Sequence, residues 1–195
     1  MKKNEHEDLE YLMTHGSQHQ LTYAKLAKKR TLFVSEDVND NMAAQLSAML
    51  LYLNNVSKTD PIRMYIHTNG GASTGLTNIY DVMQLISAPI ETICLGKCYS
   101  AGAILLAAGT SGLRFGMKNC SVMIHGVQAT FPIPGHDIHD SKDYYKFLKE
   151  SNDNVIRILA NHTKQPFEKV REDCKKDVWL TCKEAIEYGI IDYEL

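Results

Sequence analysis

Residues 95–109 read LGKCYSAGAILLAAG, the end of an apolar strand that passes directly into an apolar helix. Ser100 stands at the junction and is followed by Ala101, Gly102 and Ala103, which are too small to crowd its hydroxyl. Strand-to-helix junctions are typical of βαβ units, and ligands of parallel sheets bind beyond the carboxyl ends of the strands. The stretch therefore indicates both a fold class and the place of a site.

The same pattern continues on both sides of this junction. Branched and aromatic runs predict strands, and apolar residues at helical spacing predict helices. Strand and helix alternate three times in the first half, so we expect an α/β fold with repeated βαβ units, a mostly parallel sheet and a long protruding helix. The expected strands are 30–36, 62–68, 90–95, 113–117 and 120–125, and the expected helices are 42–55, 74–86, 100–109, 141–162, 165–174 and 181–189.

The composition is that of one globular domain. The 195 residues are 44% hydrophobic and 23% charged, with a net charge of -2. This charge gives no sign of a nucleic-acid or anionic-membrane partner, and no apolar run approaches the length of a membrane span. Residues 1–22 are polar and aperiodic, so we interpret them as a flexible extension or pro-segment preceding a single domain, 23–195. Their charged start lacks the apolar core of a signal peptide, which favours a cytoplasmic location.

Cysteine and histidine spacing gives no support for a metal or a disulfide framework. The cysteine count is odd and no spacing repeats, so buried thiols are expected. The HDIH stretch, with His136 and His139, lacks further ligands, and we expect no metal and no other cofactor. The cysteines are Cys94, Cys98, Cys120, Cys174 and Cys182.

Ser100 by itself is compatible with more than one role. It can cap the helix with its hydroxyl, or it can react beside the unpaired N–H groups of the helix start. A phosphate-binding loop is excluded, because Glu91 stands where its first glycine belongs and Cys98 replaces its Ser or Thr. A GxSxG elbow is excluded because Cys98 also takes the place of its first glycine.

Three more positions carry chemistry near predicted strands. Gly70 and Gly71 follow strand 62–68 and form either a simple turn or a backbone N–H aimed at an oxyanion. His125 ends strand 120–125 and is either structural or a base. Asp177 lies after two lysines and, taken alone, is a solvated acid.

Together these segments resemble a known family. From AKLAKKRTLFV to Leu195, about 170 residues, the chain resembles the proteolytic subunit of Clp protease, a serine peptidase. The most specific segments are residues 79–125, from IYDVMQLI to SVMIH, and EAIEYGIID. The resemblance implies the ClpP/crotonase-like fold and a homo-oligomeric, heptameric ring, single or stacked in pairs. Such a ring encloses the active sites and acts on peptides or unfolded proteins.

The resemblance also implies roles for individual residues. Ser100 is then the nucleophile and His125 the base, while Asp177 holds the imidazole in the correct tautomer. Gly71 and Ala101 supply the two N–H groups of the oxyanion hole. The members appear in the order Ser, His, Asp, so only folding can bring them together.

An ATP-dependent Clp unfoldase is the partner that the resemblance implies, docking in apolar pockets between subunits. Ordinary strand packing explains most of the matching positions equally well, and Arg63 replaces a usual aromatic residue there. The matching positions are Tyr65, Ile93, Leu95, Phe115, Met117 and Leu195.

The chain departs from the family pattern after the histidine. The Gly126-Val127 dipeptide replaces Gln-Pro, and residues 128–140, QATFPIPGHDIHD, replace a glycine-rich strand that pairs the two rings. Pro132 and Pro134 lack the N–H that strand pairing needs, and Lys176 replaces an arginine but cannot make a forked contact. We therefore expect rings whose stacking is weak or differently built.

Two other functions stay open at this point. A catalytically weak or inert ring subunit, with a scaffold or regulatory role, fits the altered histidine flank. An acyl-CoA hydratase or isomerase on the related fold shares the oxyanion device, but the complete Ser-His-Asp set and the short chain disfavour it.

Overall fold

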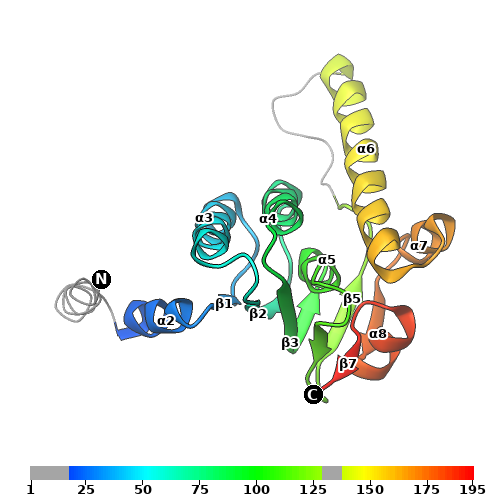
Figure 1. The fold of residues 1–195 in the computed structure, drawn as a ribbon. Helices are drawn as coiled ribbons and strands as arrows, with labels where there is room; N and C mark the ends of the chain where they lie inside the picture. Colours follow the sequence, from blue (N-terminus) through cyan, green and yellow to red (C-terminus); the bar gives the residue numbers. More distant parts are fainter. Residues whose placement is uncertain (1–17, 129–137) are drawn as a thin grey trace.

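The computed structural model describes residues 18–128 and 138–195 (Figure 1). Pro132, Pro134 and His136 lie outside these residues, as do residues 1–17. Within the described ranges the elements follow the alternation that the sequence predicts. They are α2 (Gln18–Lys28), β1 (Thr31–Val34), α3 (Asp40–Val56), β2 (Ile62–Thr68), α4 (Ser73–Leu85), β3 (Ile90–Tyr99), α5 (Ala101–Ala107), β4 (Arg114–Gly116), β5 (Ser121–Ile124), α6 (Ile138–Thr163), α7 (Phe167–Asp173), β6 (Val178–Thr181), α8 (Cys182–Tyr188) and β7 (Tyr193–Glu194).

The strands form one mostly parallel sheet, as expected from the βαβ pattern. Its main order is β1-β2-β3-β4-β7, and all of these neighbours run parallel. β5 pairs in parallel with β3, and β6 pairs antiparallel with β5. The antiparallel pair β5–β6 brings the chain after α7 back beside the strand that leads to His125.

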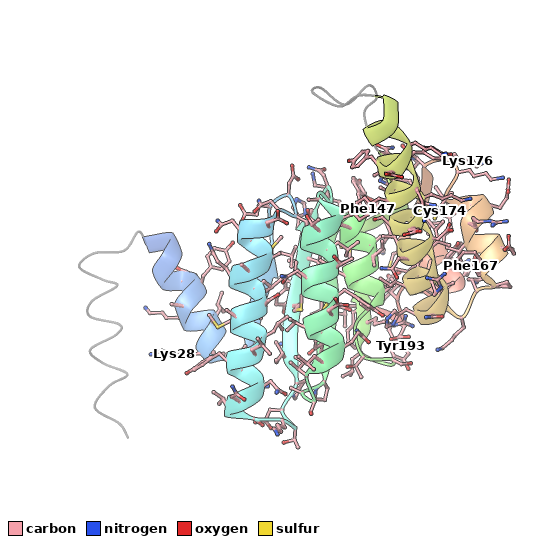
Figure 2. All side chains as sticks on the ribbon, turned by 90° about the horizontal axis from the view of Figure 1, so that it is seen from above. Lys28, Phe147, Phe167, Cys174, Lys176 and Tyr193 are labelled. Atoms are coloured by element: carbon pink, nitrogen blue, oxygen red, sulfur yellow. The ribbon has the colours of Figure 1, made fainter. Side chains whose placement is uncertain are left out.

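Helices cover one face of the sheet and hold the core there. Figure 1 shows α3, α4 and α5 on the same side of the strands, and Figure 2 shows them side by side. In β2 the alternate residues Ile62, Met64 and Ile66 are fully buried against this layer, whereas Arg63 and His67 point to the other face and are exposed. The opposite face of β2 is therefore partly exposed in the single chain.

β3 is longer than the expected strand 90–95, because it bends and changes partner. Its first half, Thr92–Cys94, pairs with β4, and its second half, Lys97–Tyr99, pairs with β5. Gly96 lies between the halves with a φ of 74°, and the register against β2 shifts at the same place. The bend carries the strand on to Ser100.

The second half of the chain contains the expected long helix, α6, which projects from the sheet in Figure 1. The predicted capping box of α8 is also present, with Thr181 and Glu184 bonded reciprocally and Gly189 at a φ of 91°. α2 begins inside residues 1–22, which the sequence predicts to be a flexible extension. The ring of Tyr23, a residue of α2, packs edge-on against the ring of Phe33. β6, β7 and α2 are elements that the sequence pattern does not predict.

Two further features concern the whole described part. All five cysteines are buried and free. Among residues 18–128 and 138–195, no helix is both long and apolar enough to cross a membrane.

Candidate functional site

The loop after β2 is built around two glycines with positive φ. Gly70 has a φ of 99° and Gly71 a φ of 146°, conformations that other residues adopt at a cost. The loop is held by a bridge in which Val38 N–H donates to Gly70 and Ala72 N–H donates to Val38, each at 2.7 Å. This bridge leaves the N–H of Gly71 unused. A Cβ on Gly71 would overlap the Val38 carbonyl and lie 2.7 Å from the Val38 nitrogen, so only glycine fits.

Ser100 occupies a strained turn between β3 and α5. Its φ of 53° and ψ of -120° are unfavourable for a residue with a Cβ. Its N–H donates to the Met123 carbonyl at 2.8 Å, which ties the turn to β5. Its hydroxyl makes no capping bond to α5, which removes the simplest structural role considered for this serine. Ala101 is the first residue of α5, so its N–H has no acceptor within the helix.

The turn at Gly70-Gly71 and the turn at Ser100 are in contact. A Cβ placed on Gly70 would lie 2.6 Å from the Ser100 Cβ and 3.0 Å from the Ala101 nitrogen. The backbone after β2 and the start of α5 thus approach each other as closely as glycine allows. Two unpaired N–H groups beside a hydroxyl form an arrangement suited to a developing oxyanion.

His125 and Asp177 come together through the β5–β6 pair. Ile124 pairs with Val178, so the residues just beyond them lie at the same end of the ladder. His125 Nδ1 lies 3.9 Å from Asp177 Oδ1, which is an ion-pair distance and too long for a hydrogen bond. The His125 side chain is 12% exposed and that of Asp177 is 47% exposed. In the described part of the chain, Nδ1 of His125 is buried without a hydrogen-bond partner.

One cavity of about 530 Å³ brings all five predicted residues together. Ser100, His125 and Asp177 line it, and so do Gly71 and Ala101. Its remaining walls are mixed, with apolar side chains from Leu76, Ile104, Met123, Leu148 and Val155 and polar ones from Asn69, Ser73, Thr74 and Gln128. The cavity thus places a hydroxyl, an imidazole and a carboxylate beside the backbone of Gly71 and Ala101.

The sequence analysis missed several parts of this cavity. α6 contributes Tyr144, Leu148 and Val155, whose i, i+4 and i+11 positions share one helix face. From the sequence, this spacing predicts that α6 has a buried face, but it does not predict that the face lines a cavity. Asn69 also lines the cavity and accepts a hydrogen bond from Lys97 Nζ at 2.7 Å, which links the glycine loop to β3.

The cysteines offer no alternative nucleophile. Burial raises the pKa of Cys174 to about 11 and that of Cys182 to about 12, so both thiols are protonated at neutral pH. Among the residues with described side chains, no three His, Cys, Asp or Glu groups are placed to hold a metal ion. His136 and the side chain of His139 lie outside that set.

The six expected docking positions lie on neighbouring strands. Tyr65, Ile93 and Phe115 are register partners across β2, β3 and β4, so they form one row across the sheet, in which Ile93 is buried and the two rings are half-buried. The ring of Phe33 stacks on that of Tyr65, with 5.3 Å between the ring centroids. Tyr193 pairs with Phe115 and so extends the row by one strand. Leu95, Met117 and Leu195 follow on the same strands or at their ends, with Leu195 N–H donating to Gly116.

One ion pair borders this row. Arg63 Nε donates to Glu91 Oε2 at 2.9 Å, two residues before Tyr65 and Ile93 on the same strands. The departure at Arg63 thus comes with a matching carboxylate on the next strand, and the pair makes this end of the apolar row polar.

Comparison with known families assigns most of the chain to one family. The family model described as Clp protease matches residues 14–193, which includes every element described above from α2 on and ends within β7. The match spans the glycine loop, the serine turn and the His–Asp pair in one continuous alignment. A peptidase function follows at the level of the family. The mostly parallel sheet, its helical layer and the projecting α6 are those of a chain that belongs to the Clp protease family.

Proposed function

We propose that the chain is a serine-type endopeptidase in which Ser100 is the nucleophile, His125 the base and Asp177 the residue that orients the imidazole. The main support is the Ser100 turn. A serine held at positive φ, with a hydroxyl that caps nothing, points to a strained residue kept for chemistry. The shared cavity supplies a base and two oxyanion donors beside it.

The proposed reaction follows from these positions. Ser100 Oγ attacks the peptide carbonyl carbon while its proton passes to His125 Nε2, because Nδ1 faces Asp177. The oxyanion accepts hydrogen bonds from the N–H groups of Gly71 and Ala101. The C–N bond then breaks as His125 gives the proton to the leaving amine. Water releases the acyl group by the same route, with His125 taking its proton and returning one to Ser100.

Ring assembly is part of the proposal. α6 and β6 expose large apolar side chains, Tyr145, Phe147 and Trp179, which a folded chain usually buries against a partner. A second copy of the chain is the partner that membership of the family suggests. The heptameric count, the stacking of two rings and a cytoplasmic location stay predictions, and residues 129–137, on which the stacking prediction depends, lie outside the described residues.

Docking of an ATP-dependent unfoldase is a further part of the proposal. Such a partner would contact the half-buried rings of Tyr65 and Phe115, which flank the buried Ile93 in this row. The Arg63–Glu91 pair restricts the apolar surface at one end, so a partner suited to this chain should present a polar group there.

The decisive experiment is labelling with a fluorophosphonate probe, read out by peptide mapping and run beside hydrolysis of a fluorogenic peptide. The wild-type protein should be labelled at Ser100, and Ser100→Ala should lose both labelling and hydrolysis. Ser111→Ala is the matched control, because Ser111 is exposed and lies away from the cavity. Well-folded rings that take no label at Ser100 would favour the inert ring subunit instead.

The second candidate function, an inert ring subunit, has one observation in its favour. The 3.9 Å between His125 Nδ1 and Asp177 Oδ1 leaves the imidazole without the bond that would orient it. Closing the gap to a hydrogen bond of about 2.9 Å takes a movement of roughly 1 Å. Catalytic hydrogen bonds are often this long before substrate binds, so the peptidase explains the distance as well.

A further inference from the structure

The backbone immediately after His125 is held from two sides. Gly126 N–H donates to the Cys174 carbonyl at 2.8 Å, and Cys174 precedes the turn that leads to Asp177. Val127 N–H donates to Oδ1 of Asn152 at 2.9 Å, and Asn152 is a half-buried residue of α6. These bonds join the segment after His125 to the chain after α7 and to α6, and Figure 2 shows Cys174 and Lys176 near α6.

Asn152 and the Gly126-Val127 dipeptide fit each other. A Cβ on Gly126 would lie 2.7 Å from Asn152 Oδ1, which is closer than side chains tolerate. A proline at position 127 would have no N–H to donate to this oxygen. A glutamine at position 126 would therefore clash with the Asn152 amide, and a proline at position 127 would leave the amide oxygen without its N–H donor. The departure from the family pattern is thus explained by a contact with α6.

The His125 ring itself depends on this backbone. Its Nδ1 has no hydrogen-bond partner in the described part of the chain, so no bond at that atom fixes the direction of the imidazole. The direction is then set by the backbone on both sides of His125. Before it, β5 is fixed by pairing with β3 and β6. After His125, the backbone is fixed by the hydrogen bonds from Gly126 to Cys174 and from Val127 to Asn152.

We propose that Asn152 is a positioning residue, whose amide oxygen holds the backbone after His125 so that the imidazole faces Ser100 and Asp177. This inference rests on the proposed serine peptidase function. It assigns to α6 a part in the reaction besides lining the cavity, and it does so without contact between Asn152 and the reacting atoms.

The test compares two substitutions with the same branching in the full-length protein. Asn152→Leu keeps the branched shape, with a larger volume, and removes the acceptor, while Asn152→Asp keeps an acceptor oxygen for Val127. Asn152→Leu should lower kcat by about 10- to 100-fold with KM near the wild-type value, the effect of a small misplacement of a catalytic group. Asn152→Asp should restore most of kcat. Asn154→Ala, on the exposed side of the same helix, is the control and should match wild type.

A second variant reaches the same contact from the other side. Gly126→Ala should displace the Asn152 amide and lower kcat by a similar factor. In the double variant Gly126→Ala/Asn152→Ala the loss should be smaller than the sum of the two single losses, because the Asn152 oxygen is gone and only the contact with the Cys174 carbonyl, at 3.1 Å, remains. Additive losses would contradict the proposed contact. Should Asn152→Leu fail to assemble, Gly126→Ala still tests the same amide.

A readout independent of turnover separates this inference from the proposed function. Diethylpyrocarbonate modifies accessible imidazoles, and peptide mapping reports each histidine by itself. His125 should react faster in Asn152→Leu than in wild type, while the half-buried His162, bonded to Tyr80, should react at an unchanged rate. Wild-type protein without any hydrolysis would refute the peptidase but leave this comparison intact. Equal His125 rates and equal kcat in wild type and Asn152→Leu would overturn the role of Asn152.

Discussion

Gly71→Ala is the substitution that most directly tests the oxyanion part of the site. The new Cβ would overlap the Val38 carbonyl and stand 2.7 Å from the Val38 nitrogen, whereas ordinary contact begins at 3.4 Å. The loop must therefore shift by about 0.7 Å or more, since the opposing atoms are backbone. Such a shift stretches a hydrogen bond of about 2.9 Å to about 3.6 Å, at which length it no longer counts as one.

Loss of one oxyanion donor fixes the expected size of the effect. Removing such a donor lowers kcat by about 10²- to 10³-fold, equivalent to about 3–4 kcal/mol in the barrier. The assay is steady-state hydrolysis of a fluorogenic peptide by assembled protein, with KM measured in the same series. We expect the loss to fall on kcat, because the donor bonds the oxyanion more strongly than the ground-state carbonyl.

Gly112→Ala is the control that separates backbone strain from the clash. Gly112 also has a positive φ, 84°, but a Cβ there would meet nothing within 4 Å. Both variants thus carry the conformational cost of about 1–2 kcal/mol, and only Gly71→Ala displaces the site. A Gly71→Ala enzyme with kcat within a few-fold of Gly112→Ala would refute the assignment of this N–H to the oxyanion hole.

Three other predictions concern the rest of the chain. Asp177→Asn should leave assembly intact and lower kcat by up to about 10⁴-fold, because the amide favours the wrong tautomer of His125; full activity in assembled particles would place the third member elsewhere. Asp192→Asn should lower the free energy of unfolding by about 3–5 kcal/mol in urea titrations, since it leaves the buried Arg114 guanidinium without its carboxylate. Burial opposes the charged form of Asp192, but hydrogen bonds from Arg114 hold the pKa of this carboxyl below its usual value. The stability that the pair contributes is therefore present above the unfolded-state pKa of Asp192 and is lost as the pH falls through the folded-state pKa. If the wild-type protein unfolds in acid at the same pH as Asp192→Asn, this origin of the stability is contradicted. Lys176→Arg should shift sedimentation profiles at raised salt toward stacked rings, because a forked contact replaces a point charge; unchanged profiles would remove Lys176 from the stacking contact.

Local pattern predicted those parts of the structure that local physics determines. The alternation of strands and helices, the Ser100 junction and the α8 capping box each depend on residues a few positions apart, and each appears in the described chain. β3 runs beyond its predicted end because its second half pairs with β5, a partner more than twenty residues later. β6 was missed for a similar reason, since its four half-exposed residues become a strand only by pairing with β5.

The site shows the same division. Strand ends alone indicate Ser100, the glycine pair and His125 as candidates, but only the family resemblance gives Asp177 a role and joins it to His125. Their approach depends on a β5–β6 register that joins residues about fifty positions apart, for which the sequence carries no local sign. Asn152 is hidden in the same way, because its partners Gly126 and Val127 lie on a different element.

The two halves of the candidate site are held with different firmness. The Ser100 turn and the glycine loop are fixed by the core, through bonds to Met123 and Val38 and through mutual contact. The His–Asp half is held less firmly, with Asp177 half exposed and its carboxylate 3.9 Å from the imidazole. In the arrangement proposed above, α6 acts on this second half through the bond between Asn152 and Val127. A partner subunit or a bound peptide that moves α6 should then change the proposed base and leave the proposed oxyanion hole in place. Changes in assembly should therefore alter the pH dependence and the size of kcat more than KM, whereas substitutions in the glycine loop should lower kcat and leave the pH profile in place.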